Sequence, residues 1–389
     1  MRIVINAQLL SDAESYRGAG VSNYARRLLS ALGELLLERH STHRLSAYVH
    51  AHRITAPGID LIDSPEILER PMARIAWEQT ALPLELRRQR ANLVHGLVNV
   101  LPLATATPGI VTVHDLSFLR TPERLPPLKR TYLTALCRVS VQRAAKVIAV
   151  SRQTAGDVTH FFGTPPEKIE VVYNGVAPEF QPIPNAAATR LRSDQNRPER
   201  YLLYLGTLEP RKNLELLIRA FGRWRQSASA VEREIVLVLA GARGWYYDTI
   251  FEQVTALGLA DSVQFPGFIP AAQLPDWYRG AEGFVYPSVF EGFGLPVLEA
   301  MACGTPVLCS HTPSLLEVAG DATLTFDPTA EEELLHGLQL LLGQPALRAE
   351  LRARGMRQAG EFSWHRCAEA TLRIYEAVGV ACPQGANAP

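Results

Sequence analysis

Short apolar runs alternate along the chain with longer segments in which apolar residues recur every three or four positions. The short runs predict buried strands, and the longer segments predict helices that cover them. This alternation indicates α/β architecture, with parallel sheets between layers of helices. Twelve strands are expected, at residues 3–6, 45–49, 93–95, 110–113, 147–150, 169–172, 201–205, 235–240, 263–265, 284–286, 307–309 and 323–326.

The strands fall into two series of six, separated by a proline-rich stretch with a polar run at residues 193–197. We therefore expect two Rossmann-like, doubly wound domains, at residues 1–178 and 200–363, joined by a linker at 179–199. Such sheets bind ligands beyond the carboxyl ends of their strands. A cleft between two facing domains is the expected site.

Composition narrows the class of protein. The chain has 389 residues, 47% hydrophobic and 20% charged, which predicts a soluble globular protein. Its 39 basic residues balance its 39 acidic ones, which argues against nucleic acid as a partner. Its five cysteines form no C-x-x-C pair, so neither a zinc cluster nor a disulfide framework is expected. With no signal-peptide or membrane-span pattern, we expect a cytoplasmic protein.

A loop between a predicted strand and helix carries the most informative residues. Gly292 and Gly294 allow close approach of a ligand to the backbone, and Pro296 suits the first turn of a helix whose start favours an anion. Glu291 and Glu299 flank this start, where they would repel a phosphate unless they bind hydroxyl groups. We expect Glu291 to hold a sugar and Glu299 a ribose. Alternatively, Glu299 only interacts with the helix dipole and Glu291 is a solvated loop charge.

A second strand-to-helix junction carries adjacent cations. Arg211 and Lys212 follow the strand at 201–205 and face the expected cleft, where they would neutralise a pyrophosphate. The alternative is that Arg211 pairs with Glu209 or Glu215 as a surface charge.

In the first domain, a glycine-rich turn that contains Gly20 follows the first strand, where its backbone would contact a phosphate or sugar. His114 ends the strand at 110–113 and would orient a sugar hydroxyl, unless it is a structural histidine. His95 is a weaker candidate of the same kind.

Six segments along the chain carry recognisable motifs. They are VHDL at 113–116, VS at 150–151, YNGV at 173–176, GTLEPRKN at 206–213, YPS at 286–288 through the two glutamates to GTPV at 304–307, and FSWHR at 362–366. Together they resemble retaining glycosyltransferases of family 4, which have the GT-B fold. The resemblance covers nearly the whole chain and is closest to the mannosyltransferase-like branch that builds bacterial surface polysaccharides.

This resemblance implies roles for individual residues. The second domain would bind a nucleotide-sugar donor, with Glu291 on the sugar, Glu299 on the ribose, and Arg211 with Lys212 on the diphosphate. His114 would lie near the transferred sugar. Many relatives carry an arginine after the strand glycine, where this chain has Thr207. The remaining matched donor-site positions are Gly20, Gly206, Gly292, Phe293, Gly294 and Leu295.

The resemblance also implies the reaction and its partners. It implies transfer of a hexose with retention, from guanosine diphosphate mannose as first choice, to a glycan or lipid-linked acceptor on the first domain. No cofactor is implied, and the lack of a D-x-D triplet agrees with a reaction that needs no metal. A helix at 364–381 would cross back onto the first domain, followed by a loose tail at 382–389.

Other functions stay open at this point. A GT-B-fold sugar-nucleotide epimerase would need acid and base residues at a ring carbon, and a glycan phosphorylase would need pyridoxal. A third option is an inactive nucleotide-sugar-binding protein. Arg87, Arg88, Arg90 and the basic stretch at 129–143 could contact the inner face of the membrane, or could be solvated helix faces.

Overall fold

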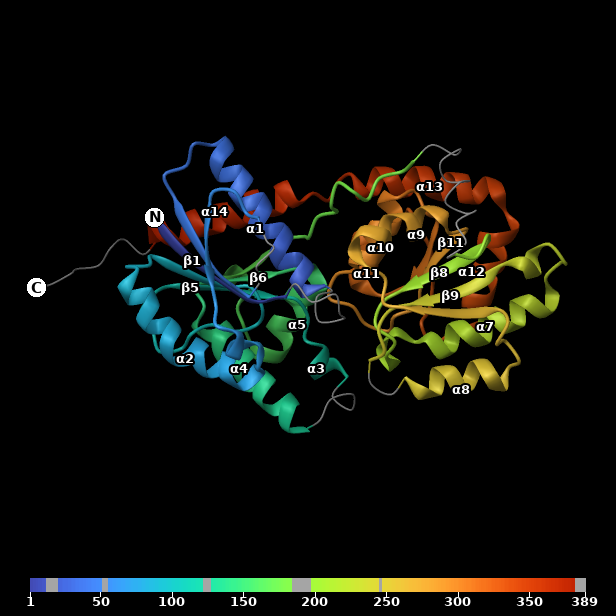
Figure 1. The fold of residues 1–389 in the computed structure, drawn as a ribbon, viewed down its shortest axis with the longest axis horizontal. Helices are drawn as coiled ribbons and strands as arrows, with labels where there is room; N and C mark the ends of the chain where they lie inside the picture. The colour runs from blue at the N-terminus through green and yellow to red at the C-terminus, as the bar shows by residue number, and fades with distance from the viewer. Residues whose placement is uncertain (12–19, 51–54, 122–126, 184–196, 245–246, 382–389) are drawn as a thin grey trace, which may run out of the picture. The chain divides into compact units, whose positions relative to one another are not determined.

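The computed structural model describes residues 1–11, 20–50, 55–121, 127–183, 197–244 and 247–381. The chain splits into two compact units (Figure 1): unit 1 comprises residues 1–175 and 363–389, and unit 2 comprises residues 176–362. The last helix, α14 (Trp364–Ala381), therefore belongs to unit 1 although it follows unit 2 in the chain. Most of the expected linker and all of the expected tail lie outside the described residues.

Unit 1 contains one parallel sheet of seven strands, in the order β3-β2-β1-β4-β5-β6-β7. Six strands confirm the prediction, and β3 is an addition to it. Two aspartates interrupt the five residues of β3, and as an edge strand it needs little apolar surface, so the hydrophobic pattern does not reveal it. The strands are β1 (Arg2–Ser11), β2 (Arg44–His50), β3 (Ile59–Asp63), β4 (Leu93–Gly96), β5 (Gly109–Val113), β6 (Lys146–Ala149) and β7 (Ile169–Val171).

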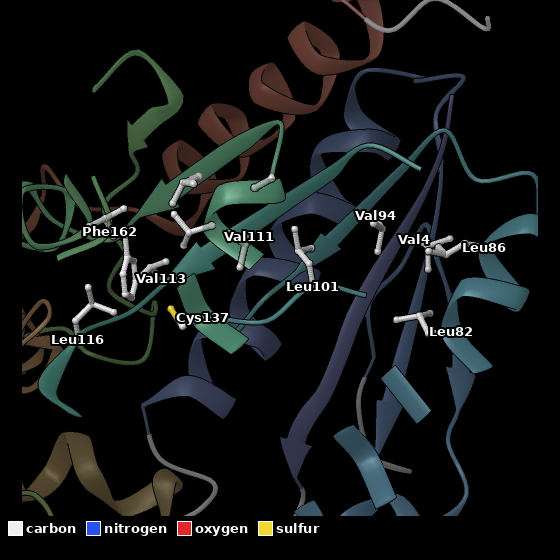
Figure 2. Packing of buried hydrophobic residues seen from close by; sticks show 14 of the residues in the cluster. Val4, Leu82, Leu86, Val94, Leu101, Val111, Val113, Leu116, Cys137 and Phe162 are labelled. Carbon is white, nitrogen blue, oxygen red and sulfur yellow. The ribbon is translucent and has the colours of Figure 1, made fainter. Parts of the chain in front are cut away.

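Helices cover both faces of this sheet. On one face, α14 packs against α1 and β4. On the other face, valines of the central strands pack against α2, α4 and α5 in one buried cluster that includes Val4, Val111, Leu82 and Cys137 (Figure 2). The helices of unit 1 besides α14 are α1 (Val21–Glu38), α2 (Pro71–Arg88), α3 (Ser117–Arg120), α4 (Pro127–Arg143) and α5 (Arg152–Phe162).

Unit 2 repeats this plan with six parallel strands in the order β10-β9-β8-β11-β12-β13, all at predicted positions. In its helical layers α12 packs against α7, and α13 packs against α10. The strands are β8 (Tyr201–Leu205), β9 (Val236–Ala240), β10 (Val263–Gly267), β11 (Gly283–Tyr286), β12 (Val307–Ser310) and β13 (Leu324–Phe326). The helices are α7 (Leu214–Ser227), α8 (Asp248–Ala256), α9 (Leu274–Gly280), α10 (Leu295–Ala302), α11 (Pro313–Ala319), α12 (Glu331–Gly343) and α13 (Pro345–Ala359).

The strand order reverses at one point in each sheet, between β1 and β4 in unit 1 and between β8 and β11 in unit 2. At each of these points, the loops that follow the two neighbouring strands run to opposite faces of the sheet. The space between the loops, beyond the carboxyl ends of the strands, can hold a ligand. The predicted doubly wound architecture is thus confirmed, and each unit has one such switch point. Among the described helices, none is both long and apolar enough to cross a bilayer.

Candidate active site

The switch point of unit 2 brings three predicted residues into contact. A short 3₁₀ turn (Pro210–Lys212) follows β8 and presents Arg211 and Lys212, while the loop after β11 presents Glu291. Lys212 Nζ lies 2.6 Å from Glu291 Oε1, and Arg211 Nη1 lies 3.0 Å from Glu291 Oε2. Both oxygens of this carboxylate therefore face a cation.

Glu209 completes a cluster of four charges. Its Oε1 accepts hydrogen bonds from Arg211 Nε at 3.1 Å and from Nη2 at 2.8 Å, and Arg211 Nη1 also donates to the carbonyl of Phe290. Arg211 thus pairs with Glu209, as the alternative interpretation predicted, and also with Glu291. Because Glu209 and Glu291 are buried, these are not solvated surface charges. Two acids balance two bases, which is the condition under which charges are stable in a protein interior.

Lys212 is deeply buried in the charge cluster. It is 6% exposed, and its Nζ also donates to the hydroxyl of Tyr286 at 2.8 Å. An ammonium carries three N–H donors, so a third remains for a ligand oxygen. Tyr286 and Glu209 are site residues that the sequence pattern did not predict. The position of Tyr286 at the carboxyl end of β11 is the signal that could have found it.

Electrostatics keep Glu291 ionised. Burial acts to raise its pKa, but Arg211 and Lys212 outweigh burial and lower the pKa of Glu291 to about 2. For Lys212, burial and the nearby Arg211 lower the pKa, and Glu291 opposes them. The charged state of each partner thus depends on the other.

The start of α10 lies directly beyond Glu291. Gly294 caps the helix with φ 109°, and a Cβ at this position would lie 2.5 Å from a methyl carbon of Leu315. Ser314 donates to the carbonyl of Glu291 at 2.7 Å and fixes the loop. Gly292 and Phe293 are buried, while Leu295 and Pro296 in the first turn are partly exposed. The amides of a first helical turn lack partners within the helix, so this turn can bind an anion.

Glu299 lies within α10 and has a different partner. It is buried, and its Oε2 accepts a hydrogen bond from the Tyr278 hydroxyl of α9 at 3.0 Å.

Gly206 follows β8, and Gly241 follows the neighbouring strand β9. A Cβ on Gly241 would lie only 1.9 Å from the carbonyl oxygen of Gly206, so these two backbones are in close contact. The carbonyl of Thr207 accepts from the Tyr204 hydroxyl.

Gly20 and His114 belong to unit 1, whereas the charge cluster belongs to unit 2. Gly20 caps α1 with φ 38°, and the glycine-rich turn before it lies outside the described residues. His114 Nε2 donates to the carbonyl of Leu97 at 2.8 Å, which leaves Nδ1 as an acceptor. Burial lowers the pKa of His114, so the ring is neutral, and the ring of Tyr24 packs edge-on against it.

His95 is a core histidine. Its two ring nitrogens contact the Tyr375 hydroxyl of α14 at 2.7 Å and Thr112 of β5 at 2.8 Å. Burial, with a smaller effect of His114, lowers the pKa of His95 to about 3. This network attaches α14 to the sheet. Within the described ranges, no three His, Cys, Asp or Glu side chains gather as a metal site requires.

Comparisons with known proteins place these observations in a family. A family model for glycosyl transferases group 1 matches residues 188–358, and one for glycosyltransferase family 4 matches residues 18–180. The O-antigen chain mannosyltransferase B of Escherichia coli is 33% identical over 269 residues, which cover 69% of this chain and 70% of that protein. The serotype-specific mannosyltransferase WbdA of E. coli is 30% identical over 270 residues, 68% of this chain but only 32% of that protein.

A solved structure supports the same fold. Sucrose-phosphate synthase from Thermosynechococcus elongatus matches with a TM-score of 0.80 and 20% identity, over 98% of this chain and 100% of that one. At this identity the likeness concerns the fold alone.

Proposed function

The chain belongs to glycosyltransferase family 4 and has the GT-B fold, and from this premise we propose that it transfers mannose from a nucleotide diphosphate sugar to a glycan acceptor. The observation that carries the proposal is the buried cluster of Arg211, Lys212 and Glu291 at the switch point of unit 2. The choice of mannose, and a role in surface polysaccharide synthesis, rest on the E. coli mannosyltransferases.

Three members of the charge cluster, together with Glu299 of α10, have roles in donor binding. The donor diphosphate contacts the guanidinium of Arg211 and the third N–H of Lys212, at the amino-terminal end of α10. Glu291 accepts hydrogen bonds from hydroxyls of the hexose, and Glu299 accepts them from the ribose. Because the cluster is neutral without donor, an incoming diphosphate draws Arg211 away from Glu209 and partly replaces the acids as its partner.

Transfer proceeds with retention and needs no bound metal. As the bond between the anomeric carbon and the phosphate oxygen breaks, negative charge grows on the leaving diphosphate, and the two cations stabilise it more than they stabilise the ground state. The acceptor hydroxyl attacks from the same face, and a leaving phosphate oxygen takes its proton. Neutral His114, whose Nδ1 can accept a hydrogen bond, orients a sugar hydroxyl and does not act as a nucleophile.

An acceptor linked to lipid would bring unit 1 close to a membrane. Arg87 and Arg88 end α2 and Arg90 follows it, while Leu128 at the start of α4 is 83% exposed beside Arg130. Basic groups with an exposed apolar side chain favour anionic lipid surfaces. Sedimentation with vesicles of anionic phospholipid should retain the protein at low salt and release it at high salt, whereas equal recovery with neutral vesicles would exclude electrostatic binding.

A panel of sugar nucleotides tests the function. Guanosine diphosphate mannose should raise the melting temperature of the protein and release guanosine diphosphate in the presence of a glycan acceptor. Turnover of a donor sugar into its epimer without acceptor would identify an epimerase instead. Binding of nucleotides with no turnover on any acceptor would favour an inactive binding protein.

A further inference from the structure

One row of side chains on α2 is polar at its amino-terminal end and apolar at its carboxyl-terminal end. Arg74, Glu78, Leu82 and Leu86 are four residues apart and share one face of the helix. Leu82 and Leu86 are fully buried against Val4 of β1 in the core of unit 1 (Figure 2). Exposure then increases along the row, from 0% at Leu82 to 6% at Glu78 and to a partly exposed Arg74. The row therefore begins in the core and ends at the surface.

Strand β1, which faces this row, changes from apolar to polar side chains at the same place. Alternate residues of a regular strand point to one face, so Val4 and Asn6 both face α2. Asn6 Nδ2 donates to Glu78 Oε1 at 3.0 Å, and Gln8 Nε2 donates to Ser64 at 3.1 Å. The interface is thus apolar at the amino end of β1 and polar toward its carboxyl end.

This polar end lies at the switch point of unit 1. Asn6 of β1 is the register partner of Gly96 of β4, and its carbonyl accepts from the amide of Leu97. The carbonyl of Leu97 in turn accepts from His114 Nε2 at 2.8 Å. Leu97 therefore connects the backbone of Asn6, whose side chain donates to Glu78, with the neutral imidazole of His114.

Packing alone does not account for an acid at position 78. Within the part of the chain that the structure describes, its only charged neighbour at ion-pair distance is Arg74, at 4.0 Å. Burial raises the pKa of Glu78, and the contacts with Asn6 and Arg74 offset this only in part. Replacing both members of a buried ion pair with apolar side chains of similar volume is often neutral or stabilising. A residue that costs stability at a ligand-binding edge is a sign of function.

One hydrogen-bond acceptor at this edge, Gln8 Oε1, is buried and has no partner among the described residues. Asn6 donates to Oε1 of Glu78, and the ion-pair contact of Arg74 is to the same oxygen, so neither contact uses Oε2. Hydroxyl groups can donate to both oxygens, whereas an ionised phosphate cannot donate and would be repelled by Glu78.

We infer that Glu78, with Gln8, forms an acceptor subsite that binds the hydroxyl groups of a neutral sugar. This inference rests on the proposed transferase function and specifies the chemical class of its acceptor. It assigns specificity to unit 1 through residues that take no part in donor binding.

Kinetics of the full-length protein test the inference. The donor is guanosine diphosphate mannose, and the acceptor probes are methyl glycosides of neutral hexoses together with methyl mannoside 6-phosphate. The variants are Glu78→Gln, which removes the charge, and Glu78→Leu, which continues the apolar row. Glu85→Gln is the matched control, because Glu85 lies on the same helix and its polar contacts are with the Tyr48 hydroxyl and Arg88.

The wild type should accept a neutral glycoside better than the phosphorylated one. Glu78→Gln should raise the KM for that glycoside by about tenfold or more, with a much smaller change in kcat and unchanged affinity for guanosine diphosphate. Glu78→Leu should abolish transfer while guanosine diphosphate binding survives, and Glu85→Gln should resemble the wild type.

Three results would overturn the inference. These are an unchanged acceptor KM in Glu78→Gln, a wild type that prefers the phosphorylated probe, and a parallel loss of melting temperature, guanosine diphosphate binding and transfer in Glu78→Leu. A wild type that releases no nucleotide from any donor with any acceptor would instead refute the proposed function itself, which separates the two failures.

Discussion

A buried lysine and a buried glutamate, 2.6 Å apart, determine each other's charge at the switch point of unit 2. Lys212 and Arg211 keep Glu291 ionised against the effect of burial, and Glu291 favours the ammonium form of Lys212. Such a pair is well suited to bind a ligand that supplies both negative charge and hydroxyl groups. Breaking it on one side leaves an uncompensated buried charge.

Stability at low pH should report this pair directly. The pKa of Glu291 lies at about 2, below its ordinary value of 4.5, so its contribution to stability is complete above pH 4.5 and is lost as the pH falls toward 2. At neutral pH we expect Glu291→Gln to unfold more easily than the wild type, by on the order of 3 kcal/mol. Urea unfolding between pH 7 and pH 2 should show this difference shrinking below pH 4.5. A difference that stays constant would mean that Glu291 is not held in its ionised form.

Removal of the lysine should slow the reaction. If Lys212 stabilises the leaving diphosphate, Lys212→Ala should lower kcat by roughly a hundredfold, as is typical when one preorganised donor to a developing charge is lost. Lys146→Ala is a suitable control, because Lys146 forms an ion pair with Glu170 on β7 of unit 1. Equal rates for the wild type and Lys212→Ala would remove Lys212 from the site.

Sequence reasoning identifies the residues of the charge cluster more easily than their partners. Arg211, Lys212 and Glu291 follow strands whose carboxyl ends are readable from the hydrophobic pattern, so their placement at one edge is predictable. The hydrogen bond from Lys212 to Tyr286 is not, because it depends on the packing of side chains 74 residues apart in sequence. The same holds for Asn6 and Glu78, which lie 72 residues apart.

At the scale of elements, the loop from β11 into α10 depends on one glycine. Gly294 combines a positive φ with a neighbouring methyl group 2.5 Å from where a Cβ would lie. Gly294→Ala should therefore lower the melting temperature and weaken guanosine diphosphate binding together, because the strain displaces the helix start. Gly343→Ala, where a Cβ would meet no atom within 4 Å, should change neither. Calorimetric melting and titration measure both quantities, and normal nucleotide binding by Gly294→Ala would show that this turn does not contact the donor.

The hydrophobic pattern predicts most elements because buried parallel strands read as short apolar runs. It misses β3 (Ile59–Asp63), a short edge strand whose apolar residues are interrupted by Asp60. It also cannot show that Tyr375 of α14 reaches His95 of β4, since this contact joins residues 280 positions apart.

At the scale of the whole chain, one strand order occurs twice, and each copy provides its own switch point. The switch point in unit 2 gathers paired charges, and the one in unit 1 gathers a neutral imidazole and a buried acid. This division agrees with a charged donor in unit 2 and an uncharged acceptor in unit 1. The sequence motifs predict the two-sheet fold and the glycosyltransferase family, whereas the acceptor subsite is inferred from the structure.

The most direct test of the central claim is a crystal structure of the protein with an unreactive analogue of guanosine diphosphate mannose. The account predicts diphosphate oxygens within about 3.2 Å of Lys212 Nζ or the Arg211 guanidinium, and hexose hydroxyls on Glu291. A nucleotide bound away from the carboxyl ends of β8 and β11, with Arg211 and Lys212 still paired only to Glu209 and Glu291, would contradict it.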